Sequence, residues 1–69
     1  MSRRVLPLAA MDKIMRKAGA LRVSESATEA LAGLLEGEGI KISEKAIMYS
    51  RHAGRKTVIR ADIILGGKS

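Results

Sequence analysis

Apolar residues recur over residues 24–52 at steps of three, four and their sums, with one single step, which is the spacing of one face of an α-helix. The positions that form this stripe are Ala27, Leu31, Leu34, Leu35, Ile42, Ala46, Tyr49 and Ala53. A helix of this length is roughly 40 Å long, and the rest of a 69-residue chain is too short to cover it. The pattern therefore predicts a long helix that needs a partner along its apolar face.

Three glycines, Gly33, Gly37 and Gly39, interrupt the middle of this segment. Each of them costs up to about 1 kcal/mol relative to Ala inside a helix. A break near residues 37–40 would give a helical hairpin, whereas a continuous helix would use the glycines for close approach of a second backbone. The stripe stays in phase across the glycines, so one continuous helix is the favoured prediction.

A shorter amphipathic segment precedes the long one, at residues 8–18. Pro7 suits the first turn of this helix, and Gly19 suits its C-terminal cap. An extended link then leads to Ser24, which is a suitable N-cap for the long helix. Ser26 and the Glu three positions later have the spacing of a capping box, which would move the start by two residues.

A second extended link and a last short helix complete the expected order. The long helix is expected to end at residues 52–54, and one or two helical turns are expected at residues 61–65. Gly66 and Gly67 are expected to stop this last helix, which leaves a tail at residues 66–69. The prediction is an all-α domain: short helix, strap, long helix, strap and very short helix.

The composition allows one domain but argues against a self-sufficient one. Apolar residues make up 46% of the chain, yet it has no Phe, Trp or Cys and only one Tyr. A domain this short is marginally stable alone, so we expect an obligate dimer in which two copies complete one core. No apolar run approaches the ~18 residues of a membrane span, and no secretory signal is expected from the charged start of the chain.

Positive charge lies on the flanks of the chain. Residues 1–23 and residues 45–69 each carry six Lys or Arg side chains against one Asp, whereas residues 24–44 carry five Glu against one Lys. The net charge is +6 and the isoelectric point is about 10.4. An acidic start suits the dipole of the long helix, and basic flanks of this strength favour nucleic acid or an anionic membrane surface as the partner.

Several motifs, in their joint order and spacing, resemble the histone fold of the minimal archaeal type. They are the Leu6-Pro7 start, the sequence KAGA at 17–20, the sequence RVS at 22–24 and the sequence RHAGRKT at 51–57. Arg55 and Thr57, followed by Asp62, match the histone pattern Arg-x-Thr-x-x-x-x-Asp. The resemblance covers residues 6–65, with a flexible basic arm at residues 1–5.

The resemblance implies a handshake homodimer that crosses two long helices and binds double-stranded DNA on one convex face. One patch would come from the paired starts of the first helices, and two more would each pair the first strap of one protomer with the second strap of the other. Arg22 would enter a minor groove, and Arg55 would pair with Asp62 to brace the second strap. The residues expected to bind DNA are Lys13, Arg16, Arg22, Lys56 and Thr57.

The early stop expected at Gly66 departs from the usual member of this family, whose last helix runs a turn or two further. The contact that joins dimers into filaments is therefore expected to be weak or absent, as in the face-to-face subgroup of prokaryotic histones, which form closed tetramers of two dimers. Glu38 lies on the apolar stripe, where a lone buried carboxylate is costly, so residues 33–40 are expected in or next to an assembly interface. The candidate dimer–dimer residues are Glu38, Tyr49, His52, Asp62 and Leu65.

The function expected from this resemblance is that of an architectural protein of the chromosome in the cytoplasm, which compacts, bends or bridges DNA with little sequence specificity. The alternative is a dimerisation module for a protein partner in a transcription or chromosome complex. The basic face of the first helix could also be an ordinary solvated face. No enzyme activity, cofactor, metal or small-molecule substrate is expected, because the single His has no second His or Cys with which to share a metal and no nucleophile–base set is evident.

Overall fold

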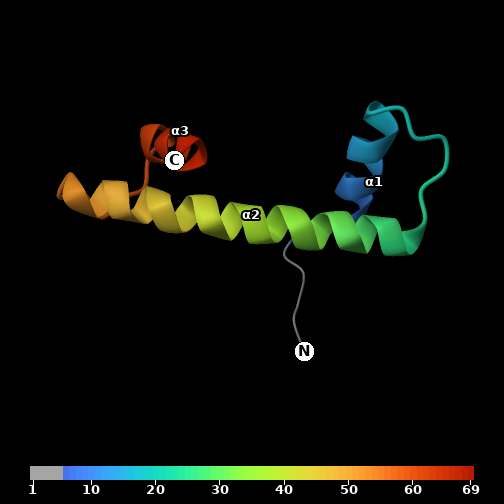
Figure 1. Cartoon of the computed structure of the whole chain (residues 1–69), viewed down its shortest axis with the longest axis horizontal. Coiled ribbons are helices and arrows are strands. Elements are labelled where there is room, and N and C mark those ends of the chain that lie inside the picture. Colours follow the sequence, from blue (N-terminus) through green and yellow to red (C-terminus); the bar gives the residue numbers. More distant parts are fainter. Residues whose placement is uncertain (1–5) are drawn as a thin grey trace. The chain divides into compact units, whose positions relative to one another are not determined.

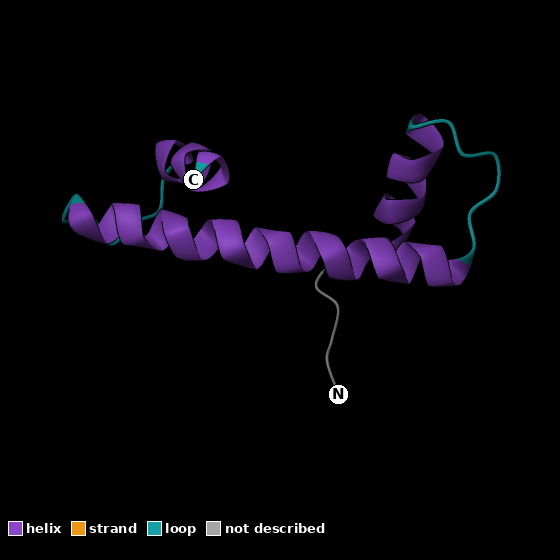
Figure 2. Cartoon of the chain, in the orientation of Figure 1, coloured by secondary structure: helices purple, strands orange, loops and turns teal. Residues whose placement is uncertain are grey.

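The computed structural model describes residues 6–69, which contain three helices and no strand (Figure 1). Helix α1 spans Leu8–Lys17, α2 spans Glu25–His52 and α3 spans Arg60–Lys68. Only loops and turns connect these helices (Figure 2). The all-α class and the order of helices and straps are confirmed. The arm predicted at residues 1–5 lies outside the described residues.

Glycines in the left-handed conformation end the first two helices. Gly19 follows α1 with a φ of 115°, and Gly54 follows α2 with a φ of 73°. After α1, the N–H of Gly19 donates to the carbonyl of Arg16 and the N–H of Ala20 donates to the carbonyl of Met15, each over 3.0 Å. This pair of bonds is a Schellman motif, which needs a residue that tolerates positive φ. Gly19 therefore caps α1, as predicted.

Helix α2 continues through its glycines as one helix, as predicted, and the hairpin alternative is wrong. Its N-cap is Ser24, because the Ser24 hydroxyl oxygen accepts a hydrogen bond of 3.1 Å from the N–H of Ala27. A side chain at Gly37 or Gly39 would meet nothing within 4 Å. Within a single chain, these two glycines are therefore not needed for a close contact.

The chain forms two compact units, Met1–Gly37 and Glu38–Ser69, and α2 contributes to both. Each unit buries few residues, and Met11 is the only large apolar side chain among those buried in the described part of the chain. The buried residues in the described part of the first unit are Met11, Thr28 and Ala32, and those of the second are Ala46, Ser50, Asp62 and Gly66.

Helix α3 packs on α2 through Gly66, and this corrects the role predicted for that residue. A Cβ atom at Gly66 would lie 2.7 Å from the carbonyl oxygen of Ile42 and 3.3 Å from the backbone nitrogen of Ala46. Gly66 and Gly67 do not stop the helix, which continues to Lys68, so the predicted end at residue 65 is wrong. The prediction weighed only the low helix propensity of glycine, whereas Gly66 here permits a close approach of two backbones.

Large apolar side chains of α2 stay exposed in the single chain. The exposed fraction is 73% for Leu34, 54% for Ile40 and 57% for Met48. Soluble proteins seldom leave so much apolar surface in water unless a partner covers it. None of the helices formed by residues 6–69 has the length and apolar character that crossing a membrane requires.

Candidate nucleic-acid interface

The second strap, residues 53–59, connects α2 to α3 and begins with the same hydrogen-bond pattern that ends α1. The N–H of Gly54 donates to the carbonyl of Arg51 over 2.9 Å, and the N–H of Arg55 donates to the carbonyl of Ser50 over 3.0 Å. This is again a Schellman motif, with Gly54 in the left-handed position. It fixes the first residues of the strap to the last turn of α2.

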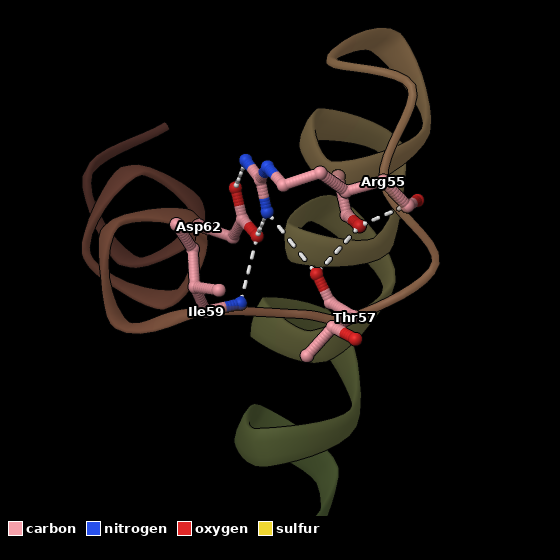
Figure 3. A network of polar contacts seen from close by, with 5 residues as sticks. Arg55, Thr57, Ile59 and Asp62 are labelled. Carbon is pink, nitrogen blue, oxygen red and sulfur yellow. Dashed lines mark hydrogen bonds and ion pairs between the residues drawn. The ribbon is translucent and has the colours of Figure 1, made fainter.

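Arg55 and Asp62 join the strap to the start of α3 (Figure 3). The Arg55 Nη1 and Nη2 atoms donate to the Asp62 Oδ2 and Oδ1 atoms over 2.7 and 2.9 Å, which is a bidentate ion pair. Asp62 Oδ2 also accepts a hydrogen bond of 2.9 Å from the N–H of Ile59, which satisfies a free donor at the N-terminus of α3. Asp62 is only 2% exposed. The structure thus brings together the two residues that the sequence pattern assigns as a pair.

These contacts keep the pair ionised. The hydrogen bonds from the Arg55 guanidinium, followed by that from the Ile59 N–H, lower the pKa of the Asp62 carboxyl from 3.8 to about 2. Both contacts favour the charged carboxylate, and they outweigh its burial, which acts in the opposite direction. The same hydrogen bonds with Asp62 raise the pKa of Arg55. The second strap is therefore held by two full charges throughout the neutral pH range.

Two carbonyl groups of the strap face donors from their own chain. The Thr57 carbonyl oxygen accepts a hydrogen bond of 3.1 Å from Arg55 Nη1 and lies 3.0 Å from the hydroxyl oxygen of Ser50. The Arg55 carbonyl oxygen lies 3.0 Å from the same hydroxyl. Ser50 is in the last turn of α2 and is 2% exposed. It is not among the residues predicted from the sequence, although a polar residue four positions after the buried Ala46 is a detectable signal.

The strap leaves cationic and N–H groups available to an anion. The side chains of Lys56 and Thr57 are exposed, and that of Thr57 points away from the ion pair (Figure 3). The backbone N–H groups of Lys56, Thr57 and Val58 have no hydrogen-bond acceptor within residues 6–69. Unpaired N–H groups of this kind bind anions such as phosphate, so the strap has the chemistry expected of a phosphate contact.

Around the first strap, residues 18–24, Arg16 is engaged within its own chain. Its Nε atom donates to Asp12 Oδ2 over 2.8 Å, and its Nη1 atom donates to the carbonyl of Leu21 over 3.2 Å. The second of these bonds fixes the strap to α1, so Arg16 has a structural role that the sequence pattern did not reveal. Lys13 and Arg22 are exposed. The depression beside Arg22 is lined by Met15, Ala20, Arg22, Val23, Ser24 and Ala27.

Two of the candidate dimer–dimer residues, Tyr49 and His52, line an open groove with Lys45, Met48 and Ser69. The end of α3 contributes Ser69 to the groove, and Lys45 Nζ donates to the carbonyl oxygen of Ser69 over 2.6 Å. This bond satisfies a carbonyl at the C-terminus of a helix, where a cation is favoured. Lys45 is a further structural residue that the sequence pattern did not indicate.

The other candidate dimer–dimer residues differ in their surroundings. Glu38 and Leu65 are exposed, whereas both carboxylate oxygens of Asp62 already accept hydrogen bonds within the chain. In the part of the chain that the structure describes, no group of three or more His, Cys, Asp or Glu side chains could hold a metal ion.

Comparison with known proteins gives similarity over nearly the whole chain. Residues 4–66 match the family model described as histone-like transcription factor (CBF/NF-Y) and archaeal histone. The chain is 52% identical over 64 residues to an archaeal histone HAN1 subunit of Thermococcus zilligii, and the match covers 93% of this chain and 96% of that protein. It is 43% identical over 58 residues to probable archaeal histone 3 of Methanocaldococcus jannaschii, and this match covers 84% of this chain and 87% of that protein.

Proposed function

The chain belongs to the family of histone-like transcription factors and archaeal histones, and from this we propose that it is an architectural protein of double-stranded DNA. It binds duplexes with little sequence specificity and compacts, bends or bridges them on the chromosome. The observation that carries the proposal is the second strap, where free N–H groups adjoin the Lys56 cation on a segment fixed by the Arg55–Asp62 pair. The role is structural rather than enzymatic.

The DNA-binding form is a handshake homodimer. The exposed Leu34, Ile40 and Met48 side chains support this, because a second copy of α2 would remove them from water. Each buried side chain of this size contributes about 1.5–3 kcal/mol, which a domain with so small a core of its own needs. Two dimers then associate into a tetramer, through the surface around Glu38, the groove at Tyr49 and His52, or both.

Both straps and the first helix contact the phosphate backbone. Lys13, Lys56 and the strap N–H groups neutralise or bind phosphates, while Arg22 enters the minor groove where that groove faces the protein. Thr57 donates its hydroxyl to a phosphate beside the strap. Such contacts position the duplex without reading its bases, which accounts for the low specificity.

A gel-shift assay with unrelated duplexes of equal length tests this proposal. All duplexes should bind with similar affinity, and the logarithm of the binding constant should fall linearly with the logarithm of salt concentration, by a slope of about 0.9 per phosphate contacted. The double variant Arg22→Ala with Lys56→Ala should bind much more weakly and with a shallower salt dependence. The matched control, Lys41→Ala with Lys68→Ala, makes the same charge change outside the straps. Equal binding by the two double variants would overturn the assigned surface.

The alternative function is a dimerisation module for a protein partner, since the matching family includes transcription factors. The same assay separates the two functions. A protein-binding module would leave every duplex unshifted even at low salt, whereas an architectural DNA-binding protein would shift all of them.

A further inference from the structure

We propose that Ser50 is a positioning residue for DNA binding, whose buried hydroxyl sets the direction of the strap N–H groups that receive a phosphate. The proposal rests on the proposed DNA-binding function and names a residue that acts through the strap rather than by touching DNA. Ser50 belongs to α2, carries no charge and is 2% exposed. Its effect must therefore pass through the groups to which it is hydrogen-bonded.

Ser50 contacts the second strap at three points. Its hydroxyl oxygen lies 3.0 Å from the carbonyl oxygen of Arg55 and 3.0 Å from that of Thr57, close enough to donate to either. Its own carbonyl accepts the N–H of Arg55 over 3.0 Å. The Thr57 carbonyl has a second donor in Arg55 Nη1. The Arg55 carbonyl has no donor other than Ser50 within the described residues, so it depends on the Ser50 hydroxyl alone.

The planarity of the peptide bond links these carbonyls to the anion-binding face. In a trans peptide, the C=O of one residue and the N–H of the next point in opposite directions. When Ser50 holds the Arg55 carbonyl, it therefore turns the N–H of Lys56 away from α2. When it holds the Thr57 carbonyl, it turns the N–H of Val58 the same way. The single hydroxyl hydrogen, which either carbonyl can accept, thus helps to orient the N–H groups of Lys56 and Val58 before DNA arrives.

Preorganisation of this kind strengthens binding, because an ordered strap loses less conformational entropy when it binds a phosphate. Loss of one hydrogen bond per strap should weaken duplex binding by the Ser50→Ala variant roughly three- to tenfold, the range that one net hydrogen bond supports. The salt dependence should be unchanged, because no cation is removed. Lys56→Ala, by contrast, should lower both the affinity and the salt slope.

Conservative variants separate positioning from simple loss of packing. Ser50→Thr keeps the hydroxyl and should bind within about twofold of the wild-type protein, well inside the loss expected for one hydrogen bond. Ser50→Cys keeps the size but is a weak donor, so it should bind like Ser50→Ala. Ser43→Ala removes an exposed hydroxyl from the same helix and should bind like the wild-type protein. Weak binding by Ser50→Thr together with strong binding by Ser50→Cys would overturn the proposal.

Amide hydrogen exchange of the DNA-free protein tests the inference independently of DNA binding. In Ser50→Ala, the N–H groups of Arg55 and Ile59 should exchange faster, while those of α1 keep their wild-type rates. Unchanged rates at Arg55 and Ile59, or faster exchange throughout the chain, would overturn the positioning role. If the wild-type protein shifts no duplex, the proposed function fails, and these rates still decide whether Ser50 holds the strap.

Discussion

The backbone of Gly66 in α3 lies against the carbonyl oxygen of Ile42 in α2, with no space for a side chain between them. A Cβ atom at Gly66 would be 2.7 Å from that oxygen, closer than a carbon and a carbonyl oxygen can approach. Gly67, the next residue in the same helix, would place a Cβ atom in open space. Two adjacent glycines of equal helix propensity therefore have opposite roles in the packing of α3.

We predict opposite effects of alanine at these two positions. Gly66→Ala should destabilise the protein by about 1–3 kcal/mol, because α3 must move away from α2 to admit the methyl group. Gly67→Ala should stabilise it by up to about 1 kcal/mol, because alanine is the better helix former and has fewer unfolded conformations. Urea denaturation at one fixed protein concentration measures both effects. A stabilised Gly66→Ala variant would mean that α3 does not pack this closely.

Among the polar groups that hold the second strap, the Asp62 carboxylate of α3 should contribute most to the stability of the fold. Asp62→Asn keeps the shape but removes the charge that holds Arg55, and it weakens the acceptor for the Ile59 N–H. We expect the midpoint of thermal unfolding to fall by several degrees. Asp12→Asn is the matched control, since its ion pair with Arg16 is an exposed pair within one helix, and such pairs contribute at most about 1 kcal/mol. Equal effects of the two variants would contradict the central role of Asp62.

The lowered pKa of Asp62 predicts an acid-dependent part of the stability. In the unfolded chain this carboxyl takes up its proton at its ordinary pKa of 3.8, whereas in the folded chain it does so only at about 2. Above about pH 4 the stabilisation is fully present, and it is lost as the pH falls from about 4 to about 2. The free energy of unfolding should therefore decline more steeply with acid in the wild-type protein than in Asp62→Asn. Parallel pH profiles for the two proteins would show that Asp62 is not the group responsible.

Several features of the fold depend on local sequence and can therefore be predicted from it. The sequence correctly predicts Gly19 as the cap of α1 and residues 52–54 as the end of α2, because a positive φ after a helix is a local requirement that glycine meets without strain. The Arg55–Asp62 pair is predicted through the resemblance to the histone pattern, whose two residues stand at a fixed spacing in one short segment, and the structure contains it.

The remaining features depend on tertiary contacts, which a local pattern does not contain. A glycine can either stop a helix or permit the close approach of a second backbone. Which role Gly66 has depends on the packing of α3 against α2, which local sequence does not contain. Likewise, the hydroxyl of Ser50 gains its importance from carbonyls five and seven residues later. Lys45 and Ser69 lie 24 positions apart in the sequence, so periodicity within one helix could not connect them.

The middle of α2 provides a test of assembly. Glu38 lies on the apolar stripe but is exposed in the single chain, next to glycines that leave open space. If this region belongs to an interface between copies, Glu38→Met should shift the protein toward larger assemblies. A buried methionine would contribute about 1.5–3 kcal/mol, whereas a carboxylate at an apolar contact must stay hydrated or find a partner. Sedimentation velocity over a dilution series measures the change in mass.

Glu44→Met is the control for this experiment. It makes the same change in charge and side chain on α2, but six residues further along the helix, which is about 120° around its axis. Glu44 is also exposed, so a general effect of added apolar surface would appear equally in both variants. A mass that rises only in Glu38→Met would locate the interface at the centre of the stripe. An unchanged mass of Glu38→Met, or an equal rise in both variants, would exclude residues 33–40 from the contact between copies.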